Sequence, residues 1–109
     1  MLSLQIQNSS EITVVRCSGR LVQGNGTDEL LRAVMSQDSR HIQIDLSSVK
    51  AIDAGGLGVL VLLERWAKGG NRKIQLVNPS KQVRETLETT GLSSVLHVYP
   101  AQQGRHQAA

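Results

Sequence analysis

The residues best suited to chemistry or binding in this sequence are an aspartate and three glycines that fall within six positions. Asp53 is followed by Gly55, Gly56 and Gly58, where an apolar run typical of a strand gives way to one typical of a helix. The free N–H groups of a first helical turn, together with the positive end of the helix dipole, can hold an anion. Glycine permits positive φ and, without a Cβ, lets another surface approach the backbone. Two interpretations follow: a tight turn capped by Asp53, or an exposed surface that docks a partner or reads a phosphate.

Familiar catalytic and metal-binding patterns are missing from the sequence. Residues 53–58 match neither the Gly-x-Gly-x-x-Gly fingerprint nor the phosphate loop that ends in Gly-Lys-Ser/Thr. His41, His97 and His106 have no cysteine or second histidine at metal-ligand spacing. Gly-x-Ser-x-Gly is absent, so a hydrolase nucleophile lacks its motif. We therefore expect a protein that is not an enzyme and that binds no cofactor and no metal.

The composition is that of one folded domain. Among 109 residues, 14 Leu, 11 Val and 6 Ile supply an aliphatic core, and Trp66 and Tyr99 are the only aromatic residues. Twelve Lys and Arg against nine Asp and Glu give a net charge of +3. Because so few aromatic side chains cannot build a stacking platform for single strands, no nucleic-acid partner is expected.

The location of the protein is expected to be cytoplasmic. Cys17 stands alone, so no intrachain disulfide can form and a reducing compartment is indicated. Only ten uncharged residues separate Asp53 from Glu64, which is far short of the about 20 apolar residues needed to cross a bilayer. The first residues show no signal-peptide pattern. Direct insertion into a membrane is therefore not expected.

Hydrophobic periodicity places strands and helices in alternation along the chain. The expected strands cover residues 2–7, 11–18, 41–46, 73–77 and 95–99, and the expected helices begin near residue 27, at residue 56 and after residue 78. This order, ββαβαβαβ, predicts an α/β fold with a mixed sheet, opened by an antiparallel hairpin, and with helices packed on one face. One domain at residues 1–100 and a flexible C-terminal tail at residues 101–109 are expected.

Turn and cap residues set the expected ends of these elements. Gly19 is expected to end the second strand, and Asn25 or Thr27 to cap the first helix. Asn78 is expected to cap the third helix, with the following proline at the first helical position. The second helix, at residues 56–68, carries so many aliphatic side chains that it should be largely buried.

Three segments occur in an order and spacing typical of one family: Ser18-Gly19-Arg20-Leu21, Ile44-Asp45-Leu46-Ser47 and Asp53-Ala54-Gly55-Gly56-Leu57-Gly58. With the order of elements and the Asn-Pro pair before the third helix, they make the chain resemble the STAS domain, the fold of bacterial anti-sigma factor antagonists, over residues 2 to about 99. The resemblance implies a protein without catalytic chemistry of its own. Such a protein binds an anti-sigma factor of the serine-kinase type, which has a histidine-kinase-like ATPase fold, and thereby releases a sigma factor.

The chain departs from the family's pattern at the position that the kinase modifies. Family members typically read Asp-Ser-Ser-Gly-Leu-Gly, and the phosphorylated serine stands just before Gly-Leu-Gly. That position is Gly55 here, and Ala54 replaces the preceding serine, so the hydroxyl that would accept phosphate is missing. A phosphoserine would add about −1.5 to −2 charge units and block a docking surface. We therefore expect this chain to bind any partner as an unphosphorylated antagonist does, without a phosphate at residue 55.

The resemblance assigns partner binding to a loop, the helical turn that follows it and a neighbouring loop: Asp53, Ala54, Gly55, Gly56, Leu57, Gly58, Arg20 and Gly24. An alternative with the same fold is a scaffold or accessory subunit, as in STAS proteins of lipid-transport ABC systems or of stress-sensing assemblies. A third possibility is a small-ligand or nucleotide-binding domain with a pocket at the glycine turn.

Overall fold

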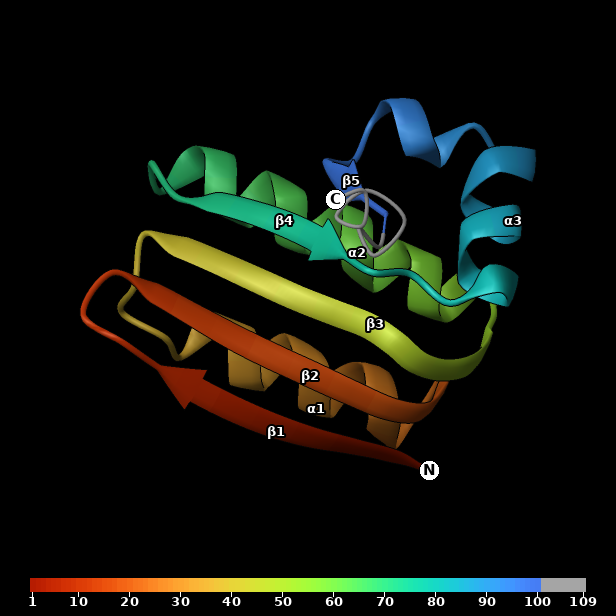
Figure 1. Ribbon diagram of the computed structural model, residues 1–109, viewed down its shortest axis with the longest axis horizontal. Helices are drawn as coiled ribbons and strands as arrows, with labels where there is room; N and C mark the ends of the chain where they lie inside the picture. The colour runs from red at the N-terminus through yellow and green to blue at the C-terminus, as the bar shows by residue number, and fades with distance from the viewer. Residues whose placement is uncertain (101–109) are drawn as a thin grey trace, which may run out of the picture.

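A mixed sheet of five strands forms the centre of the computed structural model, which describes residues 1–100 (Figure 1). The strands are β1 (Leu2–Asn8), β2 (Ile12–Leu21), β3 (His41–Ile52), β4 (Lys73–Val77) and β5 (Val98–Tyr99). The helices are α1 (Asn25–Met35), α2 (Ala54–Gly69) and α3 (Lys81–Thr89), and the 3-10 helix η1 covers Leu92–Ser94. The predicted order and the mixed sheet are confirmed. The tail predicted at residues 101–109, which includes His106, lies outside the described residues.

Strand order in the sheet follows the chain, β1-β2-β3-β4-β5. β1 and β2 form the predicted antiparallel hairpin, with Leu2 opposite Gly19 and Asn8 opposite Thr13, whereas the other neighbouring strands are parallel. Parallel neighbours require crossover connections, which α1 and α2 supply. The carboxyl ends of β2, β3 and β4 therefore lie at the same end of the sheet. The segments that leave these strands are neighbours in space.

Helices α1 and α2 lie side by side on one face of the sheet, behind it in Figure 1, and α3 packs against β3. The largest fully buried side chains are all aliphatic: Leu21, Leu30, Ile42, Ile44, Leu46, Leu60, Leu63, Leu87, Val15, Val34, Val49 and Val83. The opposite face of the sheet is polar, with Arg16 donating to Gln7 at 2.7 Å and Gln43 donating to Gln75 at 3.3 Å. A sheet with one face packed and one face in water gives this alternation of apolar and polar side chains.

Strand β2 continues through Gly19 to Leu21, so the prediction that Gly19 ends the strand was wrong. Gly19 has a φ of 107°, and a Cβ at this position would collide with the main-chain carbonyl of Met1. The pairing of β2 with β3 shifts register beside it, between Gly19 and Arg20. The positive φ and the lack of room for a Cβ therefore explain this glycine, which lies inside the strand and does not end it.

The caps of α1 and α3 differ from those predicted. The N-cap of α1 is Gly24, with a φ of 123°, and the hydroxyl of Thr27 in the first turn donates to the Gly24 carbonyl at 2.8 Å. Ser80 caps α3 in place of Asn78, since the Ser80 Oγ accepts the N–H of Val83 at 3.3 Å. Asn78 takes a left-handed φ of 51° and is a turn residue.

Helix α2 is longer and less buried than predicted. It begins at Ala54, and Leu62, one of the aliphatic residues of this predicted helix, is 53% exposed. Trp66 is half-buried, and the guanidinium carbon of Arg72 lies 4.6 Å from the centre of a Trp66 ring. Strand β5 is shorter than predicted, because η1 precedes it. Within residues 1–100, no helix is both long enough and apolar enough to span a membrane.

Candidate functional site

The carboxylate of Asp53 joins the start of α2 to the loop between β2 and α1. As the N-cap of α2, its Oδ1 accepts the N–H of Gly56 at 2.9 Å. The N–H of Gln23 lies 3.1 Å from both carboxylate oxygens. The bond from Gly56 first, and then the bond from Gln23, lower the pKa of Asp53 from its usual value, because both favour the charged form. Asp53 is the cap that the sequence predicts, and it also fixes a second segment.

Gly56 lets the backbone of α2 press against the end of β2. It is buried, and a Cβ there would collide with the carbonyl oxygen of Leu21 and lie 2.9 Å from Cγ1 of Ile52. Among the described residues, the glycines with positive φ are Gly19, Gly24 and Gly91, so the glycines of α2 are not chosen for an unusual backbone angle. What Gly56 supplies is the absence of a side chain.

Gly55, the position at which the resemblance leads us to expect a phosphorylated serine, lies against the side chain of Gln23. A Cβ on Gly55 would overlap Oε1 of Gln23 and lie 2.9 Å from Cβ and 3.0 Å from Cα of that residue. A flexible side chain could turn away, but its Cβ and Cα cannot move without the backbone. Sequence reasoning did not identify Gln23, because no motif marks it.

The outer side of the first turns of α2 is open. Ala54 and Gly58 are exposed, and a Cβ on Gly58 would meet no atom within 4 Å. Leu57 is half-buried and packs against the core. The surface here consists of backbone and small side chains, which a partner can approach closely.

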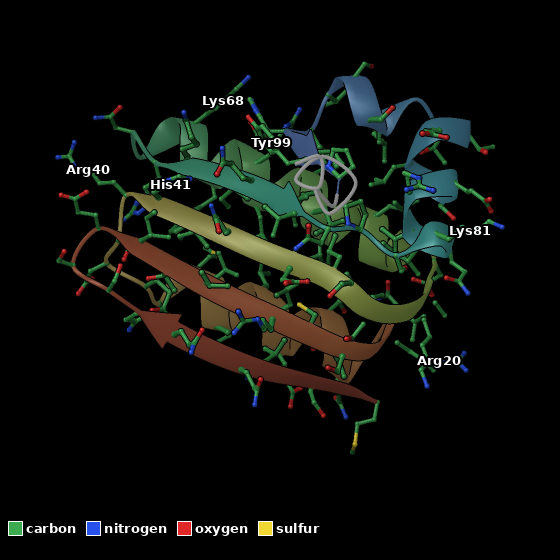
Figure 2. The ribbon with its side chains drawn as sticks, in the orientation of Figure 1. Arg20, Arg40, His41, Lys68, Lys81 and Tyr99 are labelled. Carbon is green, nitrogen blue, oxygen red and sulfur yellow. The ribbon has the colours of Figure 1, made fainter. Side chains whose placement is uncertain are left out.

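Arg20 and Gly24 lie close to Gln23 in the chain, one before it and one after it. Both are exposed, and Arg20 belongs to the end of β2, where it pairs with Ala51 of β3. Arg20 and Gln23 line a pocket of about 340 Å³ together with Met1, Leu2, Val22, Asn25, Gly26 and Glu29. Arg20 projects at the end of the molecule that also carries Lys81, and Arg40 and His41 lie at the opposite end (Figure 2). The structure thus brings the two predicted segments together, and the contact between Gln23 and Asp53 joins them.

Other groups capable of chemistry are placed elsewhere. Burial first, and then the negative charge of Asp45, raise the pKa of the Cys17 thiol to about 12, so this side chain is protonated at neutral pH and serves the core. Nε2 of His97 lies 3.8 Å from Oε2 of Glu64. Within residues 1–100, no three side chains among His, Cys, Asp and Glu are grouped closely enough to hold a metal ion.

These features define a small α/β domain that presents a nearly side-chain-free helix start to solvent. A family model described as "Mlab, STAS domain" matches residues 4–98. The chain belongs to the STAS-domain family.

Curated proteins similar to this chain include anti-sigma factor antagonists. An anti-sigma F factor antagonist of Paenibacillus polymyxa is 28% identical over 107 residues, which cover 90% of this chain and 86% of that protein. An anti-sigma-B factor antagonist of Staphylococcus aureus is 25% identical over 71 residues, covering 65% of this chain and 66% of that protein.

Among solved structures, a putative anti-sigma factor antagonist from Thermotoga maritima superposes with a TM-score of 0.81 at 18% identity, covering 96% of this chain and 92% of that one. The unphosphorylated form of the anti-sigma factor antagonist SpoIIAA gives a TM-score of 0.73 at 17% identity, covering 97% and 96% of the two chains. These likenesses confirm the fold.

Proposed function

We propose that this chain is a non-enzymatic interaction module that binds an anti-sigma factor and so acts as its antagonist. Relatives over most of its length are named antagonists of anti-sigma factors. The observation that carries the proposal is the exposed, side-chain-poor start of α2, joined by Asp53 to the neighbouring loop. Because such a partner acts on a sigma factor, we expect the protein in the cytoplasm.

The proposed docking surface has an exposed part and a supporting part. The exposed part consists of Asp53, Ala54, Gly58, Arg20, Gln23 and Gly24. Gly55 and Leu57 are partly covered at its centre, and Gly56 is buried beneath it. The bonds from Asp53 to both segments hold the two halves of the surface in one arrangement, which lowers the entropy lost when a partner binds.

The proposed partner is an anti-sigma factor of the serine-kinase type with a histidine-kinase-like ATPase fold. Neither Gly55 nor Ala54 has a hydroxyl, so a kinase cannot switch this surface off by phosphorylation at these two positions. The nearby hydroxyl of Ser47 donates to the Asp45 carboxylate at 2.7 Å, which fits a local structural role. Control of such a complex would then come from the amounts of the two proteins or from another member of the system.

Two glycines of α2 provide a matched test. Gly58 and Gly69 both have open space where a Cβ would be placed, and both are exposed, but they lie at opposite ends of the helix. Gly58→Gln adds a side chain to the docking surface without disturbing the fold, so it should weaken binding to an anti-sigma factor kinase about tenfold or more. Isothermal titration calorimetry measures the affinity, and Gly69→Gln should leave it unchanged. Equal affinities for wild type and Gly58→Gln would contradict the proposal.

A scaffold or accessory subunit, as in a lipid-transport ABC system or a stress-sensing assembly, is a second candidate function. The absence of a hydroxyl at Ala54 and Gly55 favours it, because a permanent subunit needs no phosphorylation switch. Purification of the tagged protein from its source cell distinguishes the two. A stoichiometric complex with a transport ATPase, and no anti-sigma factor, would support the second candidate over the first.

A further inference from the structure

The outer edge of β1 is a second surface that is open to an additional strand. β1 is the first strand of the sheet, and within residues 1–100 it pairs with β2 alone. An edge strand exposes a row of backbone N–H and C=O groups, and proteins usually protect such edges with charges, proline or bulges. The seven residues of β1, LSLQIQN, include no charge and no proline, and their pairing with β2 shows no register shift.

The backbone groups that face outward can be identified from the pairing with β2. The N–H of Arg20 donates to the carbonyl of Met1 at 3.2 Å, so these two residues form a hydrogen-bonded pair. Hydrogen-bonded and non-bonded pairs alternate along an antiparallel ladder, so Ser3, Gln5 and Gln7 also direct their backbone groups toward β2. The residues that direct backbone N–H and C=O groups outward are Leu2, Leu4, Ile6 and Asn8.

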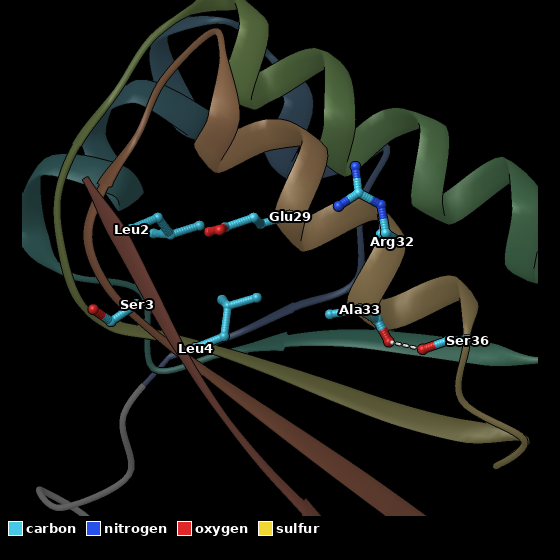
Figure 3. Close-up of a pocket in the computed structure, with 7 residues that line it drawn as sticks. All are labelled: Leu2, Ser3, Leu4, Glu29, Arg32, Ala33 and Ser36. Carbon is cyan, nitrogen blue, oxygen red and sulfur yellow. Dashed lines mark hydrogen bonds between the residues drawn. The ribbon is translucent and has the colours of Figure 1, made fainter.

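A groove of about 550 Å³ lies beside this edge, between β1 and α1 (Figure 3). Leu2 and Leu4 point from β1 toward α1 and form its apolar part. Glu29 and Arg32 of α1 contribute one negative and one positive charge, so the formal charges of the groove cancel. Ile6, further along the strand, is 42% exposed. The edge therefore combines open backbone groups with apolar side chains and no net charge.

We propose that this edge pairs with the β1 edge of a second copy of the chain, antiparallel about a twofold axis at Gln5. In this register Leu4 lies opposite Ile6 of the second copy, and Leu2 lies opposite Asn8, so all outward-facing backbone groups of the strand enter the ladder. Gln5 lies opposite its own copy. The two five-stranded sheets join into one continuous sheet.

The composition of β1 favours a second copy as the occupant of this edge. At a twofold axis a residue meets its own copy, so any charge there would face a like charge, which is destabilising. β1 has no charged residue to create that repulsion. Its apolar residues alternate with polar ones, so the antiparallel register brings Leu4 and Ile6 together on one face and glutamines together on the other.

Charge exchange at Gln5 tests this dimer directly. Gln5 is exposed, and in the proposed register its side chain is next to that of its copy. Sedimentation equilibrium from micromolar to near-millimolar concentration should show a reversible wild-type dimer. Gln5→Lys and Gln5→Glu should each weaken it about tenfold or more, and an equimolar mixture of the two variants should restore it as a heterodimer.

Controls separate the dimer contact from effects within one chain. Gln5 also pairs with Arg16 across the β1–β2 hairpin, so the Lys variant meets a like charge in its own chain. Mixing leaves that contact unchanged, and rescue by mixing is therefore the decisive readout. Gln82→Lys and Gln82→Glu, at an exposed site on α3, should leave the dimer intact. A wild type that stays monomeric throughout, or a dimer that both Gln5 variants leave unchanged, would overturn the proposal.

Discussion

Two strand-to-helix junctions, from β3 into α2 and from β4 into α3, lie at the same end of the sheet. Their N-cap side chains differ in the second contact that each one makes. In both, the N-cap side chain accepts the N–H of the residue three positions later: Asp53 from Gly56 at 2.9 Å, and Ser80 from Val83 at 3.3 Å. The hydroxyl of Ser80 also donates to the carbonyl of Val49 at 2.7 Å, so this cap is tied into the fold. Asp53 remains exposed and is bonded to the neighbouring loop.

The difference shows that capping alone does not explain the junction of β3 and α2. The third helical position is a buried valine in α3, but it is Gly56 in α2, where the carbonyl of Leu21 occupies the space. Packing therefore requires Gly56. Gly58 has open space instead, and helix propensity would favour alanine there. A glycine that neither packing nor helix stability requires is the residue that the docking proposal explains best.

The largest expected effect is on Gly56. Gly56→Ala places a methyl group against the Leu21 carbonyl and should lower the free energy of unfolding by about 1–3 kcal/mol, as overpacking does. Gly58→Ala should raise it by about 0.5–1 kcal/mol, because it relieves the entropic cost of glycine in a helix. Urea denaturation of both variants measures the contrast. Similar changes in the free energy of unfolding for Gly56→Ala and Gly58→Ala would contradict the claim that packing requires only Gly56.

Gly55 and Gln23 should be coupled energetically. Gly55→Ser brings a Cβ within 3.0 Å of Gln23 Cα and should cost about 1–2 kcal/mol of stability. Gln23→Gly removes the overlapping side chain and keeps the N–H that binds Asp53, so the double variant should recover about 0.5–1 kcal/mol relative to additivity. A double-mutant cycle by urea denaturation gives this coupling. A value near zero would mean that Gln23 moves aside freely.

The smallest effect is a pH dependence that only one of the two caps should show. Because the pKa of Asp53 is lowered in the folded state, its charge stabilises the fold above its usual pKa of 3.8, and this contribution is lost as pH falls below that value. The stability difference between wild type and Asp53→Asn should therefore shrink as acid is added. Ser80→Ala should differ from wild type by an amount that does not depend on pH. Thermal unfolding between neutral and acidic pH compares the three proteins, and a constant difference for Asp53→Asn would contradict the assigned cause.

The sequence was sufficient to predict what depends on local pattern. Alternation and helical spacing predicted the order of elements and the hairpin, and Asp53 before a helical run predicted its cap. The ends of β2 and β3 were predicted too early, because Gly19 and Ser47 are typical of turns, although both lie within strands that pair with each other. The pairing of β2 with β3, which are distant in the sequence, determines where these two strands end.

The role of Gln23 could not be predicted, for a related reason. It lies 30 residues before Asp53 in the chain, and the two meet only because β2 and β3 are parallel neighbours. No local pattern records such a contact. The sequence therefore identified both halves of the candidate site, and the fold supplied the residue that joins them.

Titration of the wild-type protein into an anti-sigma factor kinase, before and after long incubation with ATP, tests the central claim most directly. The account predicts binding in both cases with the same affinity, and no increase in the intact mass of the chain, because neither Gly55 nor Ala54 can accept a phosphate. Loss of binding after incubation, together with a mass increase of one phosphate, would contradict it.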